Sequence, residues 1–411
     1  MKIGYLMQAG VPNLREYPLT GPALHVKHVF EELVKQGHTL RLLAFFDRRI
    51  WKSDDLEHFE SVIVPAMDRG VVRLFERGVR RVQFELHLPY AALFESVRFA
   101  LACRQELRGS DLLYERMGWF GWGGGLAARW LNVPLILEVN GDYLDELAMQ
   151  GMMPRGAQRW LSVCLMRRAA QTASFTVSAG TGLRARHIER WRVNPDRIAV
   201  IENGTDLVDL LAAEQLRAFA ARSNRAEPLI IAHAGGFNPW QGVPVLIRAI
   251  RRAVSAGIAL RVWLIGAGPE LAQTQQLVRD LDLENQVAFT GQLPMREYAT
   301  RLADADVGIS AYCGRAEFSG LKLLDYKAAG LAIIASGKDG QPAVIEPEHT
   351  GLIVPPCDAD ALYRAIARLS ADRELVRRMG RAARRQAEQT HSWKVTAQHL
   401  NDLFGRVVNA H

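Results

Sequence analysis

The chain has 411 residues, of which 49% are hydrophobic and 23% are charged, and its formal net charge is +7. This length fits two domains that each bury a core, and this composition excludes a disordered or low-complexity protein. No run of about 18 apolar residues occurs, and the start MKIGYLMQAG has the pattern of a buried strand rather than a cleavable leader, so we expect a cytoplasmic protein.

The positive charge favours anionic partners, among them nucleotide sugars, polyprenyl phosphates, anionic lipid surfaces and nucleic acid. Charge alone does not choose among these partners. Four cysteines are scattered without zinc or redox spacing, so we expect reduced, mostly buried thiols at Cys103, Cys164, Cys313 and Cys357. No structural metal site follows from this pattern.

Apolar runs followed by helical patterns recur along the first half of the chain. They lack the alternation of apolar and polar residues that marks a half-exposed sheet. Such continuous runs are typical of parallel strands that are buried on both faces and joined by helices. The runs are KIGYLMQAG (2–10), TLRLLAFF (39–46), DLLYERMG (111–118), PLILEVNG (134–141), FTVSAG (175–180) and IAVIENG (198–204). The first half therefore predicts a doubly wound α/β domain.

A basic amphipathic helix is predicted between the second and third of these strands. Arginines recur every four residues at Arg69, Arg73, Arg77 and Arg81, with apolar residues falling mainly on another face. One interpretation is a solvated face beside a core stripe, favoured by the helix-weakening Gly70 and Gly78. The other is contact with an anionic membrane or a phosphorylated lipid acceptor.

Polar residues stand at the ends of two consecutive strands. Because ligands of doubly wound folds lie at the carboxyl ends of strands, Glu115, Arg116, Glu138 and Asn140 are expected to face the binding cleft. An equally good interpretation of Arg116 and Glu138 is a mutual ion pair. His25 and His28 are three residues apart on a predicted helix, but a third metal ligand is missing from the pattern.

The second half repeats the strand and helix plan. Its apolar runs are LIIAHAGG (229–236), LRVWLIGAG (260–268), QVAFTG (286–291), DVGISAY (306–312), LAIIAS (331–336) and GLIVPP (351–356). We therefore predict two domains, 1–206 and 207–390, followed by a terminal helix within 391–411 that docks on a domain surface. A Gly-x-Gly at Gly266 does not complete a dinucleotide fingerprint, because Leu271 replaces its third small residue.

The segment RAEFSGLKLLDYKAAGLAIIAS (315–336) places two acids, Glu317 and Asp325, around the start of a helix. Backbone N–H groups at Ser319, Gly320 and Leu321 would point out of the helix N-terminus, where the dipole favours an anion such as a diphosphate. Asp325 follows two turns later and can accept hydrogen bonds from the vicinal hydroxyls of a ribose. The alternative is an ordinary amphipathic helix.

This segment resembles the retaining, nucleotide-sugar-dependent glycosyltransferases of family 4. Their signature is two glutamates separated by seven residues, and here the second acid is Asp325, whose arm is one methylene shorter. The run from Lys322 to Gly330 is similar to the family's Lys, apolar, apolar, acid, Tyr, any, Ala, Ala, Gly segment. The resemblance covers nearly the whole chain and implies the GT-B architecture, in which two Rossmann-like domains face a central cleft.

The resemblance also implies roles for individual residues. Gly21 would approach the donor diphosphate, and Gly236 and Gln241 stand where most relatives carry an Arg and a Lys that grip it. Gly266 and Leu293 belong to turns beside the nucleotide base. The first domain would bind the acceptor, with Glu138 and Asn140 on that side, and the second would bind the donor.

The chemistry implied is transfer of a sugar with retention of configuration, without a metal ion or cofactor. Glu317 would position the donor sugar, while Lys322 and Arg116 would neutralise the departing diphosphate. The acceptor would be a glycan, a lipid-linked molecule or a small molecule, and nucleic acid is not an expected partner. Two rivals are a nucleotide-sugar epimerase of similar fold and a non-catalytic nucleotide-sugar binding protein, the latter suggested by Gly236, Gln241 and Asp325.

Overall fold

A computed structural model describes residues 1–8, 14–15, 21–86, 88–149, 151–211, 228–313 and 320–411. The chain forms two compact units, each with its own sheet of mainly parallel strands. The first comprises Met1–Glu202 together with Thr396–His411, and the second comprises Asn203–Val395.

The sheet of the first unit has eight strands in the order β4-β3-β2-β1-β5-β6-β7-β8. All six predicted strands are present, and all of them run parallel. Two strands that the sequence did not predict, β3 and β4, pair antiparallel at one edge. The strands are β1 (Lys2–Met7), β2 (Thr39–Phe46), β3 (Arg49–Ser53), β4 (Glu60–Val62), β5 (Leu112–Arg116), β6 (Leu135–Val139), β7 (Phe175–Ser178) and β8 (Ile198–Val200).

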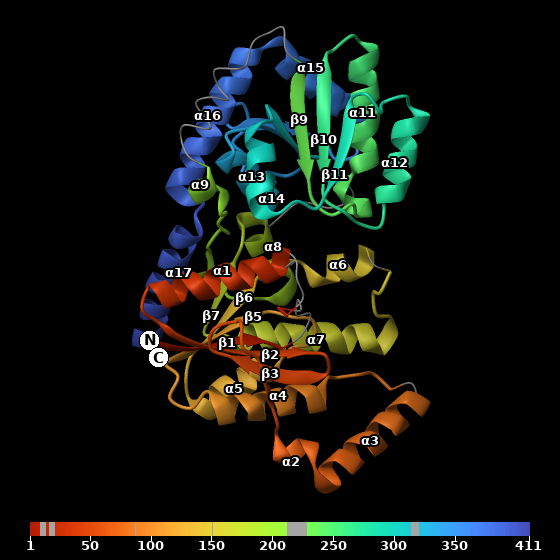
Figure 1. The fold of residues 1–411 in the computed structure, drawn as a ribbon. Helices are drawn as coiled ribbons and strands as arrows, with labels where there is room; N and C mark the ends of the chain where they lie inside the picture. Colours follow the sequence, from red (N-terminus) through yellow and green to blue (C-terminus); the bar gives the residue numbers. More distant parts are fainter. Residues whose placement is uncertain (9–13, 16–20, 87, 150, 212–227, 314–319) are drawn as a thin grey trace. The chain divides into compact units, whose positions relative to one another are not determined.

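Helices cover both faces of this sheet, as Figure 1 shows for α1 on one side and α4 and α5 on the other. Leu6 and Leu113 share a core with Phe99 of α4, whereas Tyr5 faces Phe30 of α1. Such two-sided burial is the reason these strands are continuously apolar. The helices are α1 (Gly21–Lys35), α2 (Pro65–Asp68), α3 (Gly70–Glu85), α4 (Leu93–Glu106), α5 (Gly123–Leu131), α6 (Tyr143–Met149), α7 (Gly156–Thr172) and α8 (Thr181–Trp191), with a 3-10 turn at Pro195–Arg197.

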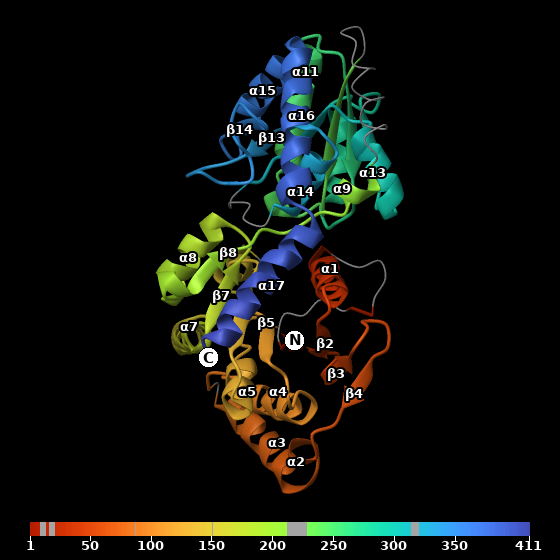
Figure 2. The same ribbon diagram turned by 90° about the vertical axis from the view of Figure 1, so that its left-hand side faces the viewer.

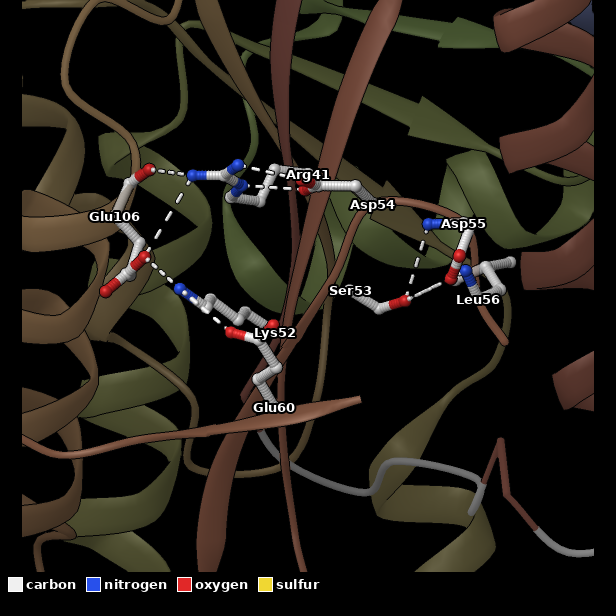
Figure 3. A network of polar contacts seen from close by, with 8 residues as sticks. All are labelled: Arg41, Lys52, Ser53, Asp54, Asp55, Leu56, Glu60 and Glu106. Atoms are coloured by element: carbon white, nitrogen blue, oxygen red, sulfur yellow. Dashed lines mark hydrogen bonds and ion pairs between the residues drawn. The ribbon is translucent and has the colours of Figure 1, made fainter. Parts of the chain in front are cut away.

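A polar network ties the antiparallel edge of this sheet to α4 (Figure 3). Lys52 on β3 donates to the Glu106 carboxylate at 3.1 Å and lies 3.4 Å from Glu60 on β4. Arg41 on β2 makes two hydrogen bonds to Asp54, of 2.7 and 2.8 Å, and one to the carbonyl of Glu106. Because these groups belong to three strands and one helix, the network holds the edge hairpin against the rest of the unit.

The second unit contains a six-stranded parallel sheet in the order β11-β10-β9-β12-β13-β14. The strands, all six of them predicted, are β9 (Leu229–Ala234), β10 (Leu260–Ile265), β11 (Val287–Gly291), β12 (Val307–Ser310), β13 (Ala332–Ser336) and β14 (Gly351–Val354). The helices are α9 (Leu207–Leu210), a 3-10 turn (Pro239–Gln241), α11 (Val243–Ser255), α12 (Leu271–Asp280), α13 (Met295–Ala303), α14 (Leu321–Ala328), α15 (Ala359–Ala371) and α16 (Arg373–Thr390). Two doubly wound domains, as predicted, account for the described chain.

The terminal helix α17 (Trp393–Asn409) starts in the second unit, and its residues from Thr396 onward belong to the first. Phe404 is fully buried, and its ring lies 5.2 Å from that of Tyr114 on β5. Asn401 Oδ1 accepts a 2.9 Å hydrogen bond from His38 Nε2. The helix therefore completes the core on one face of the first sheet, where Figure 2 shows it beside β5 and β7.

The cysteines differ from the prediction of four reduced thiols. Cys313 and Cys357 form a disulfide, whereas Cys103 is a buried free thiol and Cys164 is an exposed one. The 44 residues that separate Cys313 from Cys357 obscured the pair, because spacing along the chain does not reveal which loops of a doubly wound sheet meet.

Helix α3 lies at the periphery of the first unit, beyond α4, in both views (Figures 1 and 2). Its apolar side chains are open to solvent, since Val71 is 80% and Phe75 is 63% exposed, whereas Glu76 is its buried residue. The interpretation of this segment as a solvated face beside a core stripe is therefore wrong in one respect, because the apolar stripe is not buried in the core. Among the described residues, no helix is long and apolar enough to cross a membrane.

We predict that Phe404→Ala lowers the free energy of unfolding of the first unit by about 3 kcal/mol or more, because it leaves a cavity against Tyr114. Arg406→Ala on the exposed side of α17 should change it by less than about 0.5 kcal/mol. Chemical denaturation followed by tyrosine and tryptophan fluorescence measures both. Equal stability of the two variants would show that α17 is not part of the core.

Candidate functional site

In each sheet the chain reverses its winding direction between two neighbouring strands, and ligands of such folds lie at the carboxyl ends beside that point. The reversal falls between β1 and β5 in the first unit and between β9 and β12 in the second. Predicted site residues cluster at both places. Gly21 is the first residue of α1, which follows β1, and it is exposed there.

Glycines at the ends of β9 and β10 allow two backbone segments to touch. Gly235 has φ of +145° and Gly266 has φ of +128°, which residues with side chains rarely adopt. A Cβ on Gly266 would collide with the carbonyl oxygen of Gly235, and a Cβ on Gly235 would lie 2.5 Å from Gln241 Oε1. Gly236 follows directly, so this strand end presents backbone rather than side chains.

Lys322 and Gln241, both predicted from sequence, are in direct contact in the second unit. Lys322 Nζ donates to Gln241 Oε1 at 3.1 Å and lies 4.8 Å from the centre of the Tyr312 ring. Burial of His233 and the nearby charge of Lys322 lower the pKa of that histidine to about 3, so it is neutral. The lysine thus places a positive charge beside the glycine strand ends.

Helix α14 is anchored to the sheet by Tyr326. The tyrosine hydroxyl accepts from the backbone N–H of Ala234 at 2.7 Å and donates to the carbonyl of Ile309 at 3.3 Å. Gly308 leaves room for the tyrosine ring, which a Cβ there would overlap. Gly320, with φ of +50°, precedes the helix, and Leu321 is its first residue.

Asp325 on α14 has partners that the sequence did not reveal. Thr205 donates a hydrogen bond of 2.6 Å to one carboxylate oxygen, and Tyr298 donates one of 2.9 Å to the other. Burial and the neighbouring Asp325 both raise the pKa of Tyr298 well above its ordinary value, so the tyrosine remains a donor.

Of the remaining residues predicted to bind the nucleotide sugar, one is described in the structure and the others are not. Leu293 lies between β11 and α13 and packs against the core that contains Ile265 and Tyr298. Glu317 and Ser319 lie outside the described residues, as does Arg315.

In the first unit Glu138 is the centre of a buried polar cluster. Its carboxylate accepts from His25 Nε2 at 2.8 Å and from the Tyr114 hydroxyl at 2.6 Å. Arg116 Nη1 lies 3.8 Å from the other oxygen, so the ion-pair interpretation of Arg116 and Glu138 is confirmed. Burial opposes ionisation, but the charges and hydrogen bonds of these neighbours outweigh it and lower the pKa of Glu138 to about 2. His25 was considered for a metal pair, and its contact with Glu138 was missed.

Asn140 follows β6 one residue after its end. Its Nδ2 is buried and has no hydrogen-bond partner among the described residues. An unpaired buried donor costs stability, and such groups are retained where a ligand or water completes them. Asn140 therefore differs from Glu138, whose Oε1 accepts two hydrogen bonds and whose Oε2 lies 3.8 Å from Arg116.

Glu115 lies on β5 on the opposite face from Tyr114 and Arg116. Its side chain is buried beside Gly124 of α5, where a Cβ would overlap its carboxyl group. Burial raises the pKa of Glu115 to about 8, so the carboxyl is mostly protonated at neutral pH. Adjacent strands thus carry one glutamate held as an anion and one held as a neutral acid.

Across the described ranges, no group of three or more His, Cys, Asp or Glu side chains is arranged to hold a metal ion. The chemistry of the candidate residues is that of hydrogen bonding and charge. Lys322 and the strand-end backbone suit a diphosphate, and the Asp325 carboxylate suits a diol.

Two family models match successive parts of the chain. "Glycosyltransferase Family 4" matches residues 19–209, and "Glycosyl transferases group 1" matches residues 215–386. The chain belongs to glycosyltransferase family 4. The resemblance found in the sequence is thereby confirmed.

Curated relatives and solved structures extend this assignment. A D-inositol 3-phosphate glycosyltransferase of Saccharomonospora viridis is 28% identical over 225 residues, which are 53% of this chain and 52% of that protein. The chain spans about half the length of the curated relatives it matches.

Among solved structures, Anabaena HepE in complex with UDP matches 99% of this chain and 100% of its own, with a TM-score of 0.71 and 17% identity. A sucrose-phosphate synthase of Thermosynechococcus elongatus matches all of both chains, with a TM-score of 0.71 and 19% identity. At such identities the likeness shows the fold, which is the predicted GT-B architecture.

We predict that Glu115 makes stability fall as the pH rises. Its pKa is about 8 in the folded protein against an ordinary 4.5, so between these values the folded state binds more protons than the unfolded state. Stability relative to Glu115→Gln should therefore be lost between pH of about 4.5 and about 8, by up to about 5 kcal/mol.

Thermal unfolding of both proteins across this pH range measures the difference. Glu189→Gln, which alters an exposed glutamate of α8, is the matched control and should follow the wild type at every pH. A difference between Glu115→Gln and wild type that does not vary with pH would show that Glu115 is ionised when folded.

Proposed function

We propose that the protein is a retaining glycosyltransferase that moves a sugar from a nucleotide donor to a hydroxyl acceptor without a metal ion. The observation that carries this proposal is the arrangement at the carboxyl edge of the second sheet, where Lys322, bonded to Gln241, stands beside the glycine strand ends. Membership of family 4 and relatives named as transferases support transfer over epimerisation. The fold of HepE, whose structure holds UDP, supports a nucleotide-sugar donor.

In the proposed reaction the acceptor oxygen bonds to the anomeric carbon while the bond from that carbon to the diphosphate breaks. The acceptor proton passes to the departing diphosphate oxygen, so no protein base is needed. Lys322 and backbone N–H groups at the start of α14 neutralise the charge that develops on the diphosphate. Asp325 holds the ribose and Glu317 positions the sugar, so catalysis is mainly orientation and electrostatics.

The first unit supplies the acceptor side in this proposal. Glu138 is held as an anion by His25, Tyr114 and Arg116, and a carboxylate with so low a pKa is a weak base. Its role in this proposal is therefore to orient Arg116 rather than to abstract a proton. Asn140 offers a buried donor that has no hydrogen-bond partner among the described residues and that suits an acceptor hydroxyl.

We also propose that the first unit contacts an anionic membrane surface. The support is helix α3, which combines exposed apolar side chains with exposed arginines at positions 73, 77 and 81. Such a helix binds membranes through apolar burial and through attraction to anionic lipid. A membrane-borne acceptor would then lie on the surface to which the enzyme binds.

We predict that Lys322→Gln lowers kcat by on the order of a hundredfold or more, because a charge that stabilises the leaving group is lost. The melting temperature should change little, since the lysine is at a helix start and only half-buried. Lys338→Gln, which removes an exposed lysine of the same unit, is the matched control and should keep wild-type turnover. Wild-type turnover in Lys322→Gln would remove the lysine from the site.

We predict that transfer persists in excess chelator and that the product keeps the anomeric configuration of the donor. A thermal-shift screen against uridine, guanosine and adenosine diphosphate sugars first identifies the donor, because a ligand that binds the folded protein raises its melting temperature. Proton NMR of the product then reports its configuration. Inversion, or a complete loss of transfer that only a divalent cation restores, would contradict the proposed mechanism.

A further inference from the structure

The first unit contains an arginine-lined cavity whose wall includes neither of the candidate acceptor residues, Glu138 and Asn140. Its volume is about 990 Å³, and its wall is formed by the β2–β3 hairpin, β4, and helices α3 and α4. Six of the fifteen lining residues are arginines and three are carboxylates. The cavity therefore carries a net positive charge that the proposed reaction does not use.

Two of the arginines pair with all three carboxylates in the cavity wall. Glu76 accepts from Arg80 at 2.7 Å and from Arg98 at 2.5 Å, Arg98 also bonds Asp68 at 2.9 Å, and Arg80 bonds Glu95. Burial works against ionisation of Glu76, but these hydrogen bonds prevail and its pKa lies below its ordinary value.

The other four arginines are exposed and form no ion pair with a carboxylate in the described chain. They are Arg48 and Arg49 of the hairpin and Arg73 and Arg77 of α3. Four unpaired guanidinium groups that face one cavity are suited to a phosphate or diphosphate, because each can donate two parallel hydrogen bonds to phosphate oxygens.

The hairpin holds its two arginines in a defined place. Asp47 and Arg48 form its two-residue turn, with φ of +52° and +58°. The network of Lys52 and Arg41 with Glu106 anchors the strands of this hairpin to α4, which also lines the cavity (Figure 3). The arginines at the turn are therefore carried by a braced element rather than by a long loop.

An apolar cavity of about 530 Å³ adjoins the arginine cavity, and the two share Arg80 and Tyr90 in their walls. It is lined by apolar side chains of α3 and of the segment that leads into α4, including Phe75, Val82 and Phe94. Val71 of α3, which does not line the cavity, is 80% exposed to solvent. A charged cavity beside an apolar one matches a molecule with an anionic head and a hydrocarbon tail.

We propose that these two cavities form one binding site for a membrane lipid that carries a phosphate or diphosphate head group. The head group lies among Arg48, Arg49, Arg73 and Arg77, and the hydrocarbon lies against the apolar side of α3. This inference rests on the membrane contact proposed above and deepens it, because it replaces a diffuse charge attraction with recognition of a particular head group.

Vesicle co-sedimentation of the full chain tests the site. The probes are phosphatidylcholine vesicles, and the same vesicles doped to equal surface charge with phosphatidic acid or with phosphatidylglycerol. Phosphatidic acid presents a terminal phosphate, whereas the phosphate of phosphatidylglycerol is capped. The wild type should bind phosphatidic acid vesicles on the order of tenfold more tightly than the phosphatidylglycerol vesicles and should not bind phosphatidylcholine alone.

Two matched double variants separate the cavity from the helix charge. Arg48→Gln with Arg49→Gln should abolish the preference for phosphatidic acid, because it empties the hairpin side of the cavity. Arg69→Gln with Arg81→Gln removes the same charge from exposed positions outside the cavity, and should weaken binding to both anionic vesicles equally while keeping the preference. Melting temperatures of all three proteins confirm that they are folded.

Three results would overturn the proposal. They are equal binding of wild type to both anionic vesicles, loss of the preference in both double variants alike, and tight binding of inorganic pyrophosphate in solution without vesicle binding. The last would assign the cavity to a soluble phosphate compound. The donor thermal shift is measured separately, so a failure here leaves the glycosyltransferase proposal standing, and failure of both vesicle binding and donor binding would remove the two together.

Discussion

Contact between two strand ends at backbone level is the constraint on which the second unit's site depends. Gly266 lies so close to Gly235 that a Cβ on it would overlap the Gly235 carbonyl oxygen, and a Cβ on Gly235 would meet the side chain of Gln241. The consequence is an edge without side chains, onto which Gln241 folds and to which Lys322 is then bonded. The cation is delivered by α14, and Tyr326 ties that helix to the same strand end.

The first unit shows how neighbouring strands can give one residue type two opposite charge states. Glu115 and Glu138 are both fully buried, and desolvation alone would raise the pKa of each. Glu138 faces His25, Tyr114 and Arg116, which stabilise its anion, whereas Glu115 faces the helix α5 at Gly124 and stays protonated. The face of the sheet, and not the residue type, decides which glutamate carries charge.

The sequence was sufficient to predict every parallel strand, because two-sided burial leaves continuous apolar runs. It missed the half-exposed strands β3 and β4 at the antiparallel side of the first sheet, where β4 is the edge strand and its burial is limited to Val62. The helix motif at Lys322 to Gly330 led to the correct family.

The sequence could not predict the contacts between residues that are distant along the chain and that the fold brings together. Thr205 and Tyr298 reach Asp325 from 120 and 27 residues away, and His25 reaches Glu138 from 113 residues away. The Cys313–Cys357 disulfide joins two loops for the same reason. Each of these partners is set by which strand ends are neighbours, and a spacing rule along one chain contains no such information.

Helix α3 illustrates the limit of periodicity as evidence for burial. An apolar stripe with a 3.6-residue period predicts that a helix has one dry face, and the sequence alone assigns that face to the core. In the structure the core side of α3 is instead a glutamate locked between Arg80 and Arg98, and the apolar stripe is turned away from it. Burying Glu76 with two arginines costs desolvation that an apolar residue would avoid. A helix arranged in this way buries less apolar surface in the protein's own core than its sequence allows. The apolar side chains that stay outside are available to a hydrocarbon phase beside the arginine cavity.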